Sequence, residues 1–397
     1  MKVAFIEQES KLGGVEYSTF RVASTLDKSK FEPVIICPEE GDLPCLARQA
    51  GLDVRIVPRP KFFSVSIIWG KRYFANPFGF IFTAINVLRT TQIMMKHLRA
   101  NRADIVVTKG LLAHFYGGIA ARRLNIPCVW YVQEEVDKKR GAGLFRYFLV
   151  KGAQKIPTKI IVDAIALLEQ FADLAALQNV VMVIYNGINT EQFAPFSLQE
   201  QKDAKRNFDI PSNTIVIGQA ARIIPLKGQE TLLKAFSLLA NDFPNTHLLF
   251  VGAPLFGSQN YEHKLHLQSL QLGLAERVHF SGFVPDVRQG LATMDIFVHA
   301  SVEADSPLTV MEAMSCGLPV IVSSVRGTVE MVNSEITALV FEPGDSEDLA
   351  IKLKNLLMSK QKQRELGAQA RKAIIEKFSL RESVIQLQTL FEELYAA

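Results

Sequence analysis

The stretch Ile296–Glu330, IFVHASVEADSPLTVMEAMSCGLPVIVSSVRGTVE, decides the fold. A short apolar run, an acidic turn, a helical segment and a second apolar run follow one another, which is the pattern of strand, turn, helix, strand and turn. A continuous apolar run is typical of a parallel strand that is buried on both faces. Ser306 suits the N-cap of the helix, and Pro307 suits its first position. The sequence therefore predicts a parallel α/β sheet that binds its ligand where strands end.

The start of this helix has the chemistry of a phosphate site. The backbone amides of Leu308, Thr309 and Val310 would be unpaired there, with the positive end of the helix dipole behind them. One turn later, the Glu312 carboxylate can accept two hydrogen bonds, as the paired hydroxyls of a ribose require. Together these groups describe a site for a nucleoside diphosphate, although an acid near the start of a helix is also favoured by the dipole alone.

The segment Glu312-Ala313-Met314, with Gly317, Pro319 and Val320 after it, carries a family resemblance. It resembles the signature E-x(7)-E and A-M-x-x-G-x-P-V of retaining glycosyltransferases with the GT-B fold (glycosyltransferase family 4, group 1 type). The resemblance implies that Glu312 binds the donor ribose and that an acid eight positions earlier faces the transferred sugar. Ala304 occupies that position, so the role falls on Glu303 or Asp305.

Length and composition describe an ordinary globular chain. With 397 residues, 48% of them apolar and 21% charged, the chain is long enough for two domains. The four cysteines form no C-x-x-C pair, which disfavours a disulfide framework or a zinc site and indicates a reducing cytoplasm. The N-terminal apolar run is too brief for a signal peptide and is better interpreted as a first strand.

The first half alternates strand and helix patterns, which predicts a Rossmann-like domain over residues 1–190. One of its expected strands is Ile105–Val107. Its first loop, KLGGVE, places Gly14 before a helix, and this loop resembles the family element close to the donor phosphates. Gln133 follows a strand where the family often has a histidine that faces the reacting sugar. An amide can hydrogen-bond a sugar hydroxyl but accepts no proton as histidine does.

The second half predicts a domain boundary followed by another Rossmann-like domain. Residues 191–209 are polar and contain proline, as expected of a linker, and the second domain covers 210–378. Arg222 and Lys227 resemble the family's G-R-x(4)-K-G element, whose cations neutralise the donor diphosphate. Gly252 ends an F-V-G strand that resembles the one near the donor. A last helix, 379–397, is expected to cross back onto the N-terminal domain, as is common in this fold.

Residues 54–103 form an insert with nine Lys or Arg and no Asp or Glu. Aromatic residues, including Trp69 and Phe82, lie between these cations. Such a composition is typical of a monotopic anchor on an anionic membrane, and a core helix with a basic solvated face is the alternative. Nucleic acid is disfavoured, because the chain contains no recognised nucleic-acid module.

These observations predict an α/β protein with the GT-B fold, in which two Rossmann-like domains face each other across a cleft. The resemblance implies a retaining hexosyltransferase that moves a sugar from a nucleotide-sugar, most simply a UDP- or GDP-sugar, to a hydroxyl of a glycan or lipid-linked glycan. No D-x-D pair is evident, so we expect neither a metal nor a cofactor. We expect a cytoplasmic protein, with peripheral attachment to the inner face of the membrane. A catalytically impaired membrane scaffold and a nucleotide-sugar epimerase of the same architecture are the alternatives.

Overall fold

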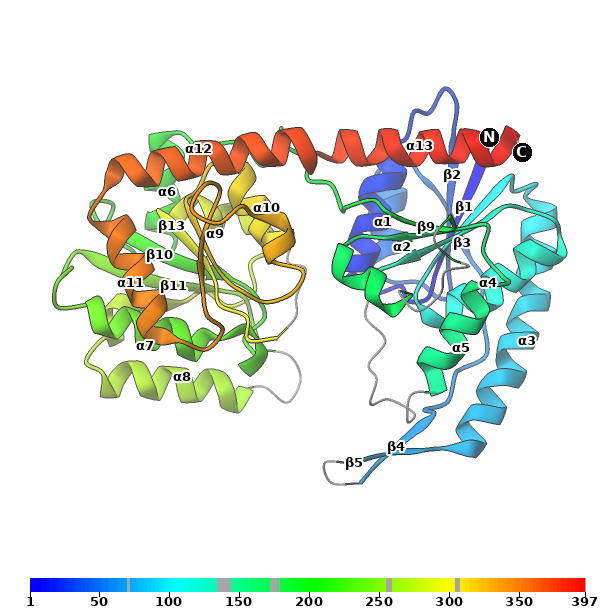
Figure 1. Cartoon of the computed structure of the whole chain (residues 1–397), viewed down its shortest axis with the longest axis horizontal. Coiled ribbons are helices and arrows are strands. Elements are labelled where there is room, and N and C mark those ends of the chain that lie inside the picture. Colours follow the sequence, from blue (N-terminus) through cyan, green and yellow to red (C-terminus); the bar gives the residue numbers. More distant parts are fainter. Residues whose placement is uncertain are drawn as a thin grey trace. The chain divides into compact units, whose positions relative to one another are not determined.

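The chain forms two compact units (Figure 1). The computed structural model describes residues 1–69, 72–133, 144–171, 177, 179–254, 259–303 and 308–396. Unit 1 comprises residues 1–187 and 380–397, and unit 2 comprises residues 188–379. The chain therefore passes between the units twice. Within the described ranges, no helix has both the length and the apolar character that a membrane span requires.

Unit 1 is built around a parallel seven-stranded sheet of order β3-β2-β1-β6-β7-β8-β9. Its strands are β1 (Lys2–Glu7), β2 (Glu32–Cys37), β3 (Asp53–Ile56), β6 (Ile105–Lys109), β7 (Cys128–Val132), β8 (Lys159–Val162) and β9 (Val181–Val183). An antiparallel hairpin, β4 (Ser66–Trp69) and β5 (Arg72–Ala75), is separate from the sheet. The helices are α1 (Gly14–Thr25), α2 (Asp42–Gln49), α3 (Pro77–Ala100), α4 (Leu111–Arg123), α5 (Leu144–Ala153), the 3-10 helix η2 (Ile165–Gln170) and α13 (Leu380–Ala396).

Both faces of this sheet are buried, because successive residues of a strand point to opposite sides. Val3 and Phe5 of β1 belong to a core with α1, α2 and α13, whereas Ala4 and Ile6 belong to a core with α3, α4 and α5. The strand order reverses between β1 and β6, so the carboxyl ends of these two strands mark the switch point where ligands of such sheets bind.

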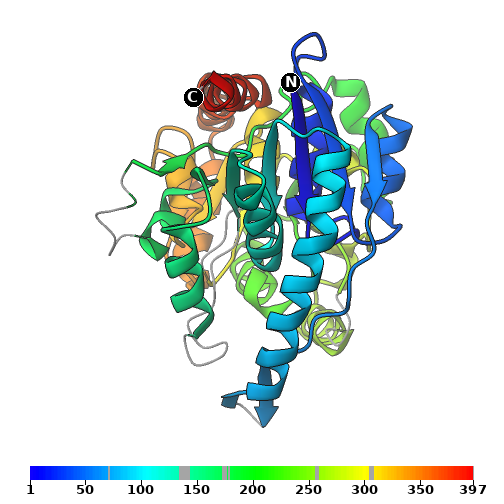
Figure 2. The ribbon, with the colours of Figure 1, turned by 90° about the vertical axis from the view of Figure 1, so that its right-hand side faces the viewer.

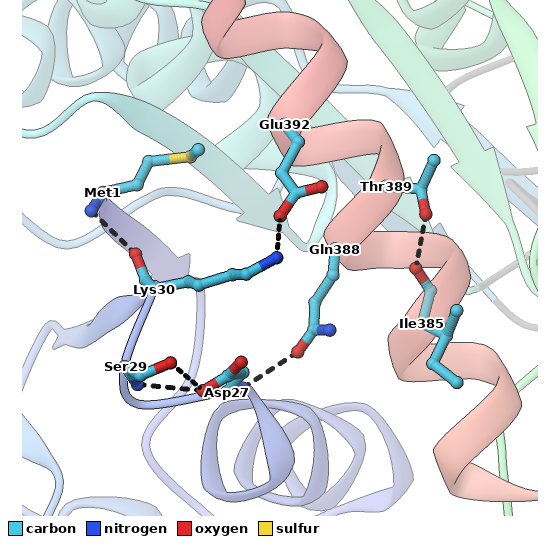
Figure 3. A network of polar contacts seen from close by, with 8 residues as sticks. All are labelled: Met1, Asp27, Ser29, Lys30, Ile385, Gln388, Thr389 and Glu392. Carbon is cyan, nitrogen blue, oxygen red and sulfur yellow. Dashed lines mark hydrogen bonds and ion pairs between the residues drawn. The ribbon is translucent and has the colours of Figure 1, made fainter.

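Helix α13 belongs to unit 1 although it ends the chain. Leu387 and Phe391 are buried in the core below it. Figure 3 shows its polar contacts: Lys30 Nζ donates to Glu392 Oε1 at 2.9 Å, and the Asp27 amide donates to Gln388 Oε1 at 2.9 Å. The N-terminal amine of Met1 donates to the Lys30 carbonyl, so both ends of the chain meet at one turn.

Unit 2 has a parallel six-stranded sheet of order β12-β11-β10-β13-β14-β15. Its strands are β10 (Ile215–Ala220), β11 (Thr246–Val251), β12 (Val278–Phe280), β13 (Ile296–His299), β14 (Val320–Ser323) and β15 (Leu339–Phe341). The helices are α6 (Leu198–Asn207), α7 (Gln229–Leu239), α8 (Gln259–Gln271), α9 (Val287–Thr293), α10 (Leu308–Ser315), α11 (Ser346–Leu357) and α12 (Lys360–Lys377), with 3-10 helices η4 (Pro225–Lys227), η5 (Ala275–Arg277) and η6 (Val329–Met331). The predicted α/β class with two Rossmann-like domains is confirmed.

Two elements differ from the sequence interpretation. The strand expected at Ile105–Val107 continues to Lys109, whose side chain is buried. The tract expected to be a linker, 191–209, contains α6, which begins with a capping box between Ser197 and Glu200. Helix α6 is fastened to unit 2, because the buried Lys205 Nζ donates to Asp295 Oδ2 at 2.8 Å.

Gly228 brings two loops of unit 2 into direct contact. It has φ +66°, and a Cβ there would lie 1.8 Å from the Ala300 carbonyl oxygen. Only a residue without a side chain allows this approach. The contact lies at the switch point of the second sheet, where the chain leaves β10 and β13.

Replacement of Gly228 tests this contact. Gly273 has nearly the same φ, +69°, but a Cβ there meets nothing within 4 Å. Both Gly→Ala variants carry the cost of a left-handed alanine, about 1 to 2 kcal/mol. We expect Gly228→Ala to lose about 1 to 3 kcal/mol more than Gly273→Ala, because the Ala300 carbonyl must move. Calorimetric unfolding of both variants measures the difference, and equal losses would show that the Ala300 contact costs nothing.

Candidate active site

The loop after β10 carries the predicted cations of unit 2. The Ala221 amide donates to the Val251 carbonyl at 2.9 Å, and the Ile223 amide donates to the Ala253 carbonyl at 3.0 Å. Two glutamine amides hold two carbonyls of the loop: Gln219 Nε2 donates to Lys227 O at 2.6 Å and Gln229 Nε2 to Arg222 O at 2.9 Å. The backbone is thus held on both sides, while the Arg222 side chain is exposed and that of Lys227 is half-buried.

Neighbouring strand ends approach this loop closely. Gly252 follows β11 with φ +138°, and a Cβ there would lie 2.1 Å from the Ala221 carbonyl oxygen. On the other side, the Val302 amide donates to the Leu226 carbonyl at 3.0 Å. Glu303 follows Val302 directly and is exposed. The fold thus gathers the Arg222–Lys227 loop, Gly252 and the chain at Glu303 at one edge of the second sheet.

Helix α10 continues from the same strand end. Leu308 and Thr309, at its start, are half-buried, and Glu312 is buried at 6% exposure. Burial, followed by the nearby Glu312 charge, raises the pKa of the Cys316 thiol to about 12. Asp305 and the expected capping residues Ser306 and Pro307 lie outside the described residues.

In unit 1, Gln133 belongs to a hydrogen-bonded network at the carboxyl ends of the strands. Its Nε2 lies 3.0 Å from Asn186 Oδ1, 3.2 Å from Asp163 Oδ2 and 3.3 Å from Ser18 Oγ. Asn186 Nδ2 also donates to Asp163 Oδ2, at 2.5 Å. Ser18 comes from α1, the helix that begins at Gly14, so the network joins α1 to the ends of β7 and β8. Gly14 itself is exposed, with open space where a Cβ would be.

A buried acid and a buried base lie beside this network. Glu7 and Lys109 are register partners at the ends of β1 and β6, and each is 1% exposed. Thr19 Oγ1 donates to Glu7 Oε1 at 2.5 Å, and Lys109 Nζ donates to Ser18 Oγ at 3.0 Å. Burial raises the pKa of Glu7 and lowers that of Lys109, while the opposite charge of each opposes these shifts.

Sequence reasoning selected Gln133 from this network and missed its partners. Glu7, Ser18, Lys109, Asp163 and Asn186 are not among the site residues expected from the sequence. Lys109 did leave a signal, because a lysine that ends an apolar run just before a glycine is placed to end a buried strand. Among the described residues, no group of three or more His, Cys, Asp or Glu side chains is arranged to hold a metal ion.

The pH dependence of unfolding tests the environment of Asp163. Burial is the largest cause that raises the pKa of this carboxyl from 3.8 to about 6. Between these values the folded chain retains a proton that the unfolded chain releases. We therefore expect wild type to lose stability relative to Asp163→Asn as the pH rises from about 4 to about 6.

Tryptophan fluorescence during denaturant unfolding measures this difference in unit 1, because both tryptophans of the chain, Trp69 and Trp130, belong to that unit. Asp27→Asn is the control. Hydrogen bonds from Ser29 lower the pKa of the exposed Asp27, so wild type should gain stability relative to this variant as the pH rises toward 3.8. A pH-independent gap between wild type and Asp163→Asn would contradict the raised pKa.

Comparisons with known proteins identify relatives along almost the whole chain. Residues 12–192 match the family Glycosyltransferase Family 4, and residues 200–373 match the family Glycosyl transferases group 1. The Escherichia coli UDP-Gal:alpha-D-GlcNAc-diphosphoundecaprenol alpha-1,3-galactosyltransferase is 24% identical, over 87% of this chain and 85% of the relative. The Campylobacter jejuni N,N'-diacetylbacillosaminyl-diphospho-undecaprenol alpha-1,3-N-acetylgalactosaminyltransferase is 26% identical, over 68% of this chain and 72% of the relative.

Solved structures show the same fold. Anabaena Alr3699/HepE, crystallised in complex with UDP, superposes with a TM-score of 0.84 at 23% identity, over 99% of this chain and 100% of the other. WaaG, a glycosyltransferase involved in lipopolysaccharide biosynthesis, superposes with a TM-score of 0.70 at 18% identity, over 97% and 99% of the two chains. With a matching family over each half and this fold throughout, the chain belongs to the group 1, family 4 glycosyltransferases and is a glycosyltransferase with the GT-B fold.

Proposed function

We propose that this glycosyltransferase moves a sugar from a UDP- or GDP-sugar to a hydroxyl of a glycan or lipid-linked glycan, with retention of the anomeric configuration. The observation that carries the proposal is the edge of the second sheet, where a rigid loop presents Arg222 and Lys227 beside the strand that leads to Glu312. Cations on a fixed backbone are placed before the reaction begins, so little reorganisation is needed when charge develops.

The donor assignment places the nucleotide on unit 2. Arg222 and Lys227 face the diphosphate, together with the amides of Leu308 and Thr309. Glu312 accepts hydrogen bonds from the ribose, and Gly252 leaves room for the donor. In unit 1, Gly14 is assigned to the donor only by the resemblance of its loop. A uridine nucleotide is favoured, because the E. coli relative is named for UDP-Gal and the Anabaena protein was crystallised with UDP.

The acceptor assignment rests on the relatives and on unit 1. Both bacterial relatives are named for diphosphoundecaprenol-linked sugars, and a Staphylococcus aureus relative is named for capsular polysaccharide biosynthesis. In unit 1, amides and hydroxyls surround Gln133 at the strand ends, and these groups suit sugar hydroxyls. We therefore propose a glycan acceptor attached to a lipid.

The proposed reaction breaks the bond between the anomeric carbon and the donor phosphate oxygen. The acceptor oxygen bonds to that carbon on the same face, and its proton passes to the leaving phosphate. Arg222 and Lys227 stabilise the charge that grows on this phosphate, which lowers the barrier more than it favours the bound donor. Glu303 or Asp305 contacts the transferred sugar, and Gln133 contacts a hydroxyl without accepting a proton. We further propose a cytoplasmic protein held at the inner face of the membrane.

Thermal shift with UDP, GDP, ADP and their sugars tests the donor site. A ligand at 100 times its dissociation constant stabilises the folded state by about 2.7 kcal/mol. We expect UDP to raise the melting temperature of wild type and to raise that of Lys227→Ala less. Lys234→Ala, an exposed lysine on the following helix, is the matched control and should respond as wild type does. A full response in Lys227→Ala would remove Lys227 from the site.

Glu312→Gln tests the ribose contact while keeping the shape of the side chain. Loss of charge-assisted hydrogen bonds of about 1.5 to 3 kcal/mol should lower kcat/KM for the donor about tenfold or more. Glu347→Gln replaces an exposed acid in the first turn of α11 and should leave kcat/KM unchanged. Equal, small effects of both changes would mean that Glu312 only complements the helix dipole.

Removal of metal ions tests whether the donor diphosphate needs a divalent cation. In the proposal, Arg222 and Lys227 neutralise its charge instead. We expect EDTA to leave the rate of sugar transfer within about twofold of the untreated enzyme, since such a change corresponds to only about 0.4 kcal/mol. Loss of activity that Mg²⁺ or Mn²⁺ restores would refute this part of the proposal. The anomeric proton coupling of the product, measured by NMR, reports retention separately.

A further inference from the structure

Helix α3 exposes an apolar stripe on its first half. The outer stripe consists of five large side chains at positions i, i+3, i+4, i+7 and i+10, so they share one face of the helix. Their exposed fractions are Phe78 72%, Ile81 56%, Phe82 51%, Ile85 40% and Leu88 52%. Figure 2 shows α3 running past the sheet toward the β4–β5 hairpin.

The opposite face of this half is polar and buried. Thr83 Oγ1 donates to the Phe63 carbonyl at 3.0 Å and accepts from the Phe63 amide at 3.1 Å. Asn86 Nδ2 donates to the Lys61 carbonyl at 2.8 Å. These bonds fasten the preceding segment across the inner face and fix the rotation of the helix. The amphipathic pattern of this half is thus inverted relative to a helix that packs its apolar face inward. The second half of α3 does pack inward, with Met94 and Leu98 in the core and its cations exposed, as the alternative of a core helix with a basic solvated face predicts.

Positive charge continues the same face. Arg89, Lys96 and Arg99 are exposed on the second half of α3, and Lys61 is exposed beside the first half. Across residues 54–103 no acid offsets these cations. The charge disfavours a second copy of this surface as the partner, because two such surfaces repel each other. It matches a surface that is both anionic and apolar at a shallow depth.

We propose that the outer stripe of α3 inserts into the interface of an anionic lipid bilayer, with Arg89, Lys96 and Arg99 on the headgroups. This inference rests on the membrane part of the proposed function and assigns it to one helix face. Each apolar side chain that leaves water strengthens partition by about tenfold, and each basic residue adds about fivefold.

Vesicle flotation tests the proposal with the full chain. Wild type should float with vesicles of phosphatidylglycerol and phosphatidylcholine, and less with phosphatidylcholine alone. Phe82→Gln/Ile85→Gln should weaken binding to the mixed vesicles about 100-fold, from two side chains at about tenfold each. Arg89→Gln/Lys96→Gln/Arg99→Gln should remove most of the preference for the anionic lipid.

The matched controls are Leu267→Gln/Leu270→Gln on α8 and Lys360→Gln/Lys372→Gln/Lys377→Gln on α12, which remove exposed apolar and basic side chains from unit 2. Both controls should float as wild type does. The thermal stabilisation by UDP is measured on every variant and verifies that each one is folded. It also distinguishes the two proposals, because an absent donor site would abolish the stabilisation by UDP but would not affect flotation. The proposal is overturned if wild type does not float, if Phe82→Gln/Ile85→Gln floats equally well, or if sedimentation shows self-association that these changes abolish.

Discussion

The contact between Gly228 and the Ala300 carbonyl holds together the strand ends on which the donor side of this enzyme depends. In a parallel sheet all strands end at one edge, but loops that leave neighbouring strands normally diverge there. Gly228 lets the loop after β10 lie directly against the chain after β13, and Gly252 does the same for the end of β11. The two cations, the exposed Arg222 and the half-buried Lys227, therefore belong to a backbone that is held on both sides.

The two units differ in the polar side chains that lie at the switch points of their sheets. Unit 2 presents Arg222 and Lys227 on a fixed loop. Unit 1 buries a carboxylate and an ammonium, Glu7 and Lys109, next to a network of amides and hydroxyls. A site of the first kind suits a multiply charged anion, whereas balanced charge and many neutral hydrogen-bonding groups suit an uncharged polyol. The same architecture thus presents two chemically different surfaces, as the proposed donor and acceptor would require.

Much of the fold, and the motifs on which the donor proposal rests, could be found in the sequence, because the relevant patterns are local. The R-x(4)-K spacing and the Glu312 segment each lie within one strand-to-helix unit. The network of Gln133 was not predictable, because Ser18, Asp163 and Asn186 meet only after the strand order is known. The burial of Lys109 was not predictable either, because lysine is almost never fully buried without a partner and its register partner Glu7 is more than 100 residues away. Helix α6 was interpreted as a linker because its sequence is polar. The direction of the apolar face of α3 depends on hydrogen bonds of Thr83 and Asn86, which the spacing of apolar residues does not reveal.

The place of α13 determines the order in which the chain can fold. Residues 188–379 are contiguous, so unit 2 is complete as soon as they leave the ribosome. Unit 1 begins the chain but lacks one wall of its core until the last helix is made, when Leu387 and Phe391 cover the sheet. The half synthesised first is therefore finished last, and until then the apolar surface under α13 is exposed to water. Translation must reach the end of the chain before the first strand has its final surroundings.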